Sequence, residues 1–160
     1  MREVREVQEG RRLVRQASEN IEREMTLLAR YRYMDVAQPT RLERSAYVLL
    51  CRIEIDGPLS IGQLVDALAL DTSTLNRQTA AMTRAGLVER IPDPEGGLAR
   101  KFRMTEEGAR KLRADRQDTV DGLRRVLADW TPEEAEMFAA ALERFNTSIE
   151  TMIGQPWPRP

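Results

Sequence analysis

The side chains best suited to molecular recognition form one short polar run, TSTLNRQ, at residues 72–78. Asparagine and glutamine amides can pair with adenine in the major groove of DNA, and an arginine guanidinium can fork to guanine or clamp a phosphate. Hydroxyl groups reach phosphates or base edges in the same setting. Polar residues on a helix usually face water, so the run alone does not decide. The candidate DNA contacts in it are Ser73, Thr74, Asn76, Arg77 and Gln78.

Basic side chains follow this run closely, although the net charge of the chain is only −1. Residues 71–103 carry six basic and four acidic side chains, whereas residues 131–150 carry one basic and five acidic. The middle of the chain can therefore face a polyanion and the C-terminal part cannot. For Arg84 and Arg90 the alternative is a plain solubility charge. We expect further DNA contacts from Arg84, Arg90, Arg100 and Lys101.

The 160-residue chain contains no histidine, which excludes Cys/His zinc sites, histidine triads and histidine general bases. It also contains no glycine-rich phosphate loop and no nucleophile elbow. We predict that it is not an enzyme and uses no cofactor and no metal. Its single cysteine, Cys51, and the lack of a secretion signal or a membrane-length apolar run predict a protein of the reducing cytoplasm.

Apolar spacing and turn residues predict the elements that position the polar run. Two strands, LVERI and ARKFRM, flank a tip rich in proline and glycine and predict a hairpin. Three helix starts, TRLE at 40–43, SIGQ at 60–63 and TPEE at 131–134, match the capping box. The predicted helices span about 3–34, 41–56, 60–68, 72–85, 105–128 and 132–152.

A helix, a short turn after Leu68, a second helix and a hairpin are the order of a winged helix-turn-helix. In that motif the second helix enters the major groove with its N-terminal residues at the base edges. Its buried side would be Leu75, Met82 and Thr79. We therefore predict a mainly α protein of six helices with a β-hairpin wing.

The stretch LSIGQLVDALALDTSTLNRQTAAMTRAGLVERIPDPEGG, followed by a strand and TEEG, resembles the MarR family of transcriptional regulators. The resemblance implies a homodimer that binds a pseudo-palindromic operator, usually as a repressor released by a small aromatic or lipophilic ligand. It implies dimerisation helices at 1–39 and 105–153, a DNA-binding lobe at 40–104 and a tail at 154–160. The ligand pocket would be lined by Tyr31, Tyr33, Met34 and Tyr47.

Two positions depart from the family pattern. The wing tip of the family often carries an acidic residue and, two positions on, an arginine for the minor groove, and Gly96 and Leu98 stand there. Gln78 and Thr79 stand where aliphatic residues are common. Two alternatives remain open: a winged-helix module for protein interaction without specific DNA binding, and an oxidation sensor acting through Cys51.

Overall fold

The computed structural model describes the backbone of residues 2–35 and 41–159, and the side chains of residues 7–30 and 41–159. The chain forms two compact units, Met1–Arg41 and Leu42–Pro160. In the first unit the structure describes the helix α1 (Arg2–Asp35). Apolar side chains on it, among them Val14, Ile21 and Leu28, are exposed. No helix in the described residues is long and apolar enough to cross a membrane.

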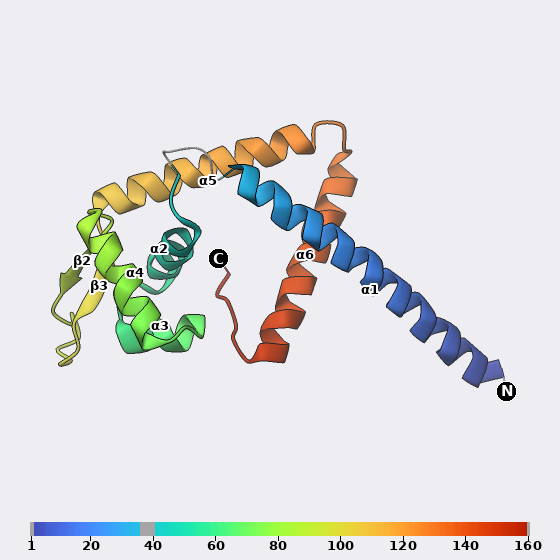
Figure 1. Cartoon of the computed structure of the whole chain (residues 1–160), viewed down its shortest axis with the longest axis horizontal. Helices are drawn as coiled ribbons and strands as arrows, with labels where there is room; N and C mark the ends of the chain where they lie inside the picture. Colours follow the sequence, from blue (N-terminus) through green and yellow to red (C-terminus); the bar gives the residue numbers. More distant parts are fainter. Residues whose placement is uncertain (1, 36–40, 160) are drawn as a thin grey trace. The chain divides into compact units, whose positions relative to one another are not determined.

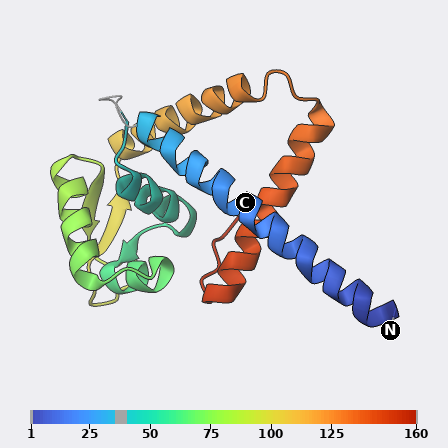
Figure 2. The ribbon, with the colours of Figure 1, turned by 45° about the vertical axis from the view of Figure 1, so that its right-hand side comes forward.

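The second unit follows the predicted order of helices and strands (Figure 1). Its two long final helices are joined by a short loop (Figure 2). Within the described residues this confirms a mainly helical fold with a small antiparallel sheet. The elements are α2 (Arg44–Asp56), β1 (Leu59–Ser60), α3 (Ile61–Leu68), α4 (Thr72–Arg84), β2 (Val88–Ile91), β3 (Lys101–Met104), α5 (Glu106–Val126) and α6 (Pro132–Ile153).

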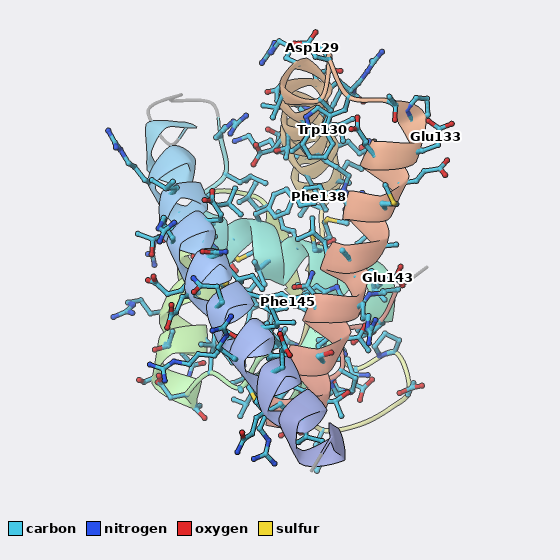
Figure 3. All side chains as sticks on the ribbon, turned by 90° about the vertical axis from the view of Figure 1, so that its right-hand side faces the viewer. Asp129, Trp130, Glu133, Phe138, Glu143 and Phe145 are labelled. Carbon is cyan, nitrogen blue, oxygen red and sulfur yellow. The ribbon has the colours of Figure 1, made fainter. Side chains whose placement is uncertain are left out.

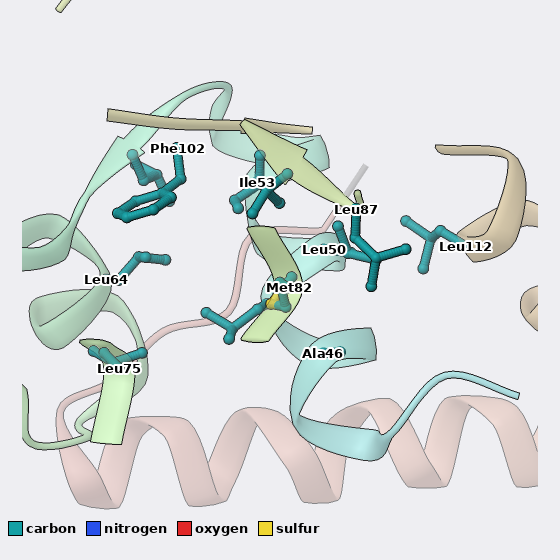
Figure 4. Packing of buried hydrophobic residues seen from close by; sticks show 12 residues of the cluster. Ala46, Leu50, Ile53, Leu64, Leu75, Met82, Leu87, Phe102 and Leu112 are labelled. Carbon is teal, nitrogen blue, oxygen red and sulfur yellow. The ribbon is translucent and has the colours of Figure 1, made fainter. Parts of the chain in front are cut away.

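One apolar core holds the three short helices against the sheet and the start of α5 (Figure 4). Leu64 of α3, Leu75 of α4 and Leu112 of α5 are fully buried in it. Thr79 and Met82 of α4 are buried as well, as predicted, so α4 has a fixed inner face. That packing sets which side chains of α4 point outward.

Side-chain caps explain most of the helix starts. The predicted capping boxes form at Ser60 with Gln63 and at Thr131 with Glu134. The box predicted at TRLE is wrong, because α2 begins at Arg44 and Glu43 is its N-cap residue, without a side-chain cap. Glu43 therefore does not stand at the third helical position, where its carboxylate could reach back to the cap.

The sheet has three antiparallel strands in the order β1-β3-β2. β2 and β3 form the expected hairpin, with Glu89 opposite Arg103 and Ile91 opposite Lys101. β1 was not predicted, since only Leu59 and Ser60 pair with β3 and two residues carry no periodic signal. This third strand ties the start of α3 to the base of the wing.

The helix α6 packs little within its own unit, and none of its residues, all of which are described, is buried. At the α5–α6 turn the Trp130 ring meets the edge of Phe138, with centroids 5.5 Å apart. Figure 3 shows Phe138 and Phe145 on one side of α6, with Glu133 and Glu143 directed away from that side. Both phenylalanine side chains are exposed, so α6 presents an apolar face among the described residues.

The chain after α6 folds back onto α2. Arg159 binds both carboxylate oxygens of Glu150, at 2.6 and 2.9 Å. The Trp157 amide donates to the same carboxylate, and the Arg52 guanidinium lies 5.4 Å from the centre of the Trp157 ring. These contacts connect the C-terminal end of α6 to the helix that forms the centre of the lobe.

Candidate nucleic-acid interface

The start of α4 is fixed by Asp71. Its carboxylate caps the helix by accepting from the Thr74 amide at 2.8 Å, and it also accepts from the hydroxyls of Ser73 and Thr74. These hydrogen bonds, first from Ser73 and then from Thr74, hold the pKa of Asp71 well below its usual range. Ser73 and Thr74 thus lie at the helix start, as predicted, with their hydroxyl hydrogens directed at Asp71.

Replacing Asp71 with alanine is expected to lower the melting temperature by a few degrees at neutral pH, since it removes an N-cap. The lowered pKa means that the stabilisation is complete above about pH 5, the upper end of ordinary carboxyl titration, and is lost as the pH falls. The difference between parent and Asp71→Ala should therefore shrink in acid. Thermal unfolding at several pH values measures it, with Asp71→Asn as the neutral capping control. A difference that stays constant down to acidic pH would contradict the assigned cap.

The next turn of α4 presents the amide and guanidinium side chains. Asn76 and Arg77 are exposed, as the sequence predicted. Arg77 makes no ion pair with any residue that the structure describes, so its charge is free to bind an anion. Gln78 differs, because it is half-buried and its Oε1 atom is buried without a hydrogen-bond partner among the described residues. Gln78 is therefore turned partly toward the fold.

A groove of about 390 Å³ lies between α4 and the base of the wing. It brings Asn76 and Arg84 of α4 together with Arg90 of β2, above a floor that includes Phe102. Arg84 and Arg90 are exposed and form no ion pair within the described part of the chain. The structure thus places three of the predicted contacts along one groove, whose cationic edge suits a phosphate backbone.

The two predicted cations of the wing, Arg100 and Lys101, lie in different environments. Arg100 is exposed, and no described carboxylate pairs with it. Lys101 is buried instead, with its Nζ atom 2.9 Å from Asp93 and 3.4 Å from Glu95. At the tip, Gly96 adopts a φ of +82°, and Leu98 is fully exposed. The predicted DNA contacts of Arg100 and Lys101 stay predictions.

Of the predicted ligand-pocket residues, only Tyr47 can be placed, because Tyr31, Tyr33 and Met34 lie outside the residues whose side chains are described. Burial raises the pKa of Tyr47, and a hydrogen bond with Arg116 of α5 opposes that rise. Arg116 also bonds Glu54 at 2.6 Å and lies 3.8 Å from the sulfur of Cys51, which is half-buried. Sequence reasoning missed Arg116, since nothing local distinguishes it from the other arginines of α5.

The described residues contain no group of three cysteine or carboxylate side chains that could hold a metal ion. The site is therefore a surface of amide and guanidinium groups on a fixed helix beside a wing. Such a surface can bind a charged polymer and read hydrogen-bonding edges.

The comparisons with known proteins agree with this fold. The sequence profile of the MarR family matches residues 42–96. YxaD of Bacillus subtilis (strain 168), described as an uncharacterized HTH-type transcriptional regulator, is 37% identical over 134 residues, which span 82% of this chain and 94% of YxaD.

Two solved structures show the same architecture. A MarR family protein from Bacillus stearothermophilus aligns with 82% of this chain and 96% of its own, at 24% identity and a TM-score of 0.64. The PcaV transcriptional regulator from Streptomyces coelicolor, solved with its natural ligand, aligns with 79% and 90%, at 21% identity and a TM-score of 0.58. The chain belongs to the MarR family of winged helix-turn-helix transcriptional regulators.

Proposed function

We propose that this protein is a sequence-specific DNA-binding repressor, which acts as a homodimer on a pseudo-palindromic operator and is released by a small aromatic or lipophilic ligand. The observation that carries the proposal is the outer face of α4. Asn76 and Arg77 are exposed there, and Arg84 and Arg90 edge the adjoining groove. A helix in the major groove would use the first pair for base edges and the second pair for phosphates.

The exposed apolar faces support the homodimer. On α6, Phe138, Leu142 and Phe145 are 47%, 41% and 39% exposed, and α1 carries its own exposed apolar stripe. Large apolar faces on soluble proteins mark interaction surfaces. A second copy would cover them through the helices of residues 1–39 and 105–153, leaving residues 40–104 as the DNA-binding lobe. Two recognition helices related by a twofold axis would then lie about 34 Å apart, one turn of DNA.

Release by a ligand is supported by relatives that bind small molecules, such as PcaV with its natural ligand. In this chain the contact between Tyr47 and Arg116 lies between α2 and α5 and offers a phenol and a cation. A ligand that binds better to a dimer with displaced recognition helices would shift the population away from DNA. Near-complete release requires a difference in affinity of about 10⁴-fold between the two states. A panel of aromatic acids and lipophilic compounds, tested by thermal shift and by operator release, examines this step.

DNA binding itself is tested by retention on immobilised mixed-sequence DNA at low salt. Phosphate contacts release counterions, so the observed affinity should fall steeply and linearly in log–log form as salt rises. A protein that passes through the column at low salt would be a protein-interaction module instead.

Sedimentation of the unbound protein reports the dimer, and a monomer at every concentration would contradict the proposed assembly.

The wing should contribute through Arg100 and not through Leu98. We expect Arg100→Ala to weaken DNA binding about tenfold and to reduce the salt slope by about one per contact, because a free guanidinium is lost. Leu98→Ala removes no charge and should change affinity less than about twofold, within the usual range for a neutral surface substitution. Fluorescence anisotropy with a labelled duplex at several salt concentrations separates the two variants. The reverse order would show that the wing binds through its apolar tip.

A further inference from the structure

The loop between β2 and β3 is a folded turn organised around one carboxylate. Asp93 Oδ1 accepts from the Glu95 amide at 3.0 Å and from Lys101 Nζ at 2.9 Å. The Gly96 amide closes the turn on the Asp93 carbonyl oxygen, also at 3.0 Å. The side chains of Asp93 and Lys101 are only 12% and 9% exposed. The pair is therefore part of the interior of the wing and not of its surface.

Gly97 completes this arrangement. A Cβ atom at Gly97 would clash with Asp93 Oδ2, and it would lie 3.2 Å from the carboxylate carbon. The carboxylate thus occupies the space of a side chain at position 97. The ammonium group of Lys101, followed by the amides of Glu95 and Gly97, lowers the pKa of Asp93, and the hydrogen bond to Asp93 raises the pKa of Lys101. Both groups stay charged across the neutral range.

We propose that Lys101 is a positioning residue of the wing, which locks residues 93–97 through Asp93 and thereby presents Arg100 to DNA. The proposal rests on the proposed function. Arg100 directly precedes β3, so a fixed Lys101 at the first position of that strand fixes the backbone from which Arg100 extends. Arg100 is indeed exposed, while the charge of Lys101 is taken up by Asp93 and Glu95.

The direction in which Asp93→Ala changes the affinity for DNA distinguishes this positioning role from a purely electrostatic effect. Removing a negative charge from a DNA-binding surface should strengthen binding to a polyanion. If Asp93 holds the lock, Asp93→Ala should instead weaken binding, by about tenfold if the Arg100 contact is lost. Glu95→Ala is the matched control, because Glu95 also lies near Lys101 but its side chain is 86% exposed. It removes the same charge and should leave the affinity unchanged or slightly higher.

Lys101→Met and the double variant Asp93→Ala/Lys101→Met complete a double-mutant cycle. The lock predicts that Lys101→Met behaves like Asp93→Ala, with a similar loss of affinity and a similar reduction of the salt slope, and that the double variant is little worse than either. A direct phosphate contact by Lys101 predicts that Lys101→Met weakens binding while Asp93→Ala strengthens it. The probe is a labelled duplex carrying the site recovered by selection from random DNA, and the assay is anisotropy across a salt series.

The backbone of the wing provides a readout that needs no DNA. Hydrogen exchange at the amides of Glu95 and Gly96 should accelerate in Asp93→Ala and in Lys101→Met, and it should stay slow at Gly96 in Glu95→Ala. If exchange responds but the parent binds no DNA, the proposed function has failed and so has the role in presenting Arg100. If Asp93→Ala binds DNA as well as Glu95→Ala does, or its exchange is unchanged, the positioning role of Lys101 is overturned.

Discussion

Arg77→Ala is expected to weaken operator binding by about 1–3 kcal/mol in each half-site, which for a dimer amounts to a loss from about thirtyfold to more than ten-thousandfold. Arg77 follows the capped first turn of α4, is exposed and forms no ion pair with any described carboxylate. Its guanidinium can therefore fork to a guanine without first breaking an ion pair. The same substitution should reduce the preference for the operator over mixed DNA.

A matched control distinguishes this contact from a general loss of positive charge. Gly108, near the start of α5, packs on the lobe, and Arg125 lies near the other end of the same helix. About 25 Å along the helix axis separates the two residues. Arg125 is also exposed and unpaired among the described residues. Because α5 belongs to the proposed dimerisation helices, sedimentation must first show that Arg125→Ala is still a dimer. Its operator affinity should then change less than about threefold, within the range of a distant surface charge. If Arg77→Ala binds as tightly as Arg125→Ala, α4 is not the reading helix.

Gly108→Ala is expected to destabilise the fold by about 1–3 kcal/mol, the range for forcing extra volume into a packed site. Gly108 is buried in the first turn of α5, and a Cβ atom there would clash with the carbonyl oxygen of Leu87 and lie 3.0 Å from its carbon. That oxygen accepts from the Thr105 amide at 3.1 Å, and the Thr105 hydroxyl donates to the neighbouring Gly86 oxygen at 2.6 Å, so Thr105 holds this stretch of backbone in place. The helix cannot move away without breaking its own cap.

The sign of this prediction is opposite to the one that helix propensity gives. Alanine favours a helix interior over glycine by about 1 kcal/mol. Gly122 in the same helix offers the control, since an added Cβ would meet only the flexible end of Arg125, at 4.0 Å. Gly122→Ala should therefore stabilise the protein by about 0.5–1 kcal/mol. Urea unfolding at one fixed protein concentration measures both variants, and equal stabilisation by the two would contradict the close contact.

The sequence predicted the helices well where the chain carries local signals. Ser60 with Gln63 and Thr131 with Glu134 form their capping boxes because each needs only four consecutive residues. The helix predicted at 72–85 also ends at a local signal, because the next residue, Gly86, adopts a φ of +70°. TRLE fits the same pattern but forms no box, because α2 begins at Arg44 and Glu43 is itself the N-cap residue.

The site was predicted less completely, since several of its side chains depend on contacts between distant residues. In the sequence, Lys101 is one of two adjacent cations and nothing marks it as buried. In the structure, the turn brings Asp93 to within 2.9 Å of it. Gln78 is turned partly inward by the rotation of α4, which Leu75 and Met82 set through their burial. Arg116 reaches Tyr47 only because α5 packs along α2. Each of these depends on tertiary packing, which local periodicity does not encode.

Selection of bound sequences from random DNA tests the central claim most directly, because it asks for sequence reading, symmetry and spacing at once. A twofold dimer that reads DNA through α4 should select an inverted repeat whose half-site centres lie about ten base pairs apart, the separation of two recognition helices on one face of the duplex. Recovery of no preferred sequence, or of a lone half-site without a symmetric partner, would contradict it.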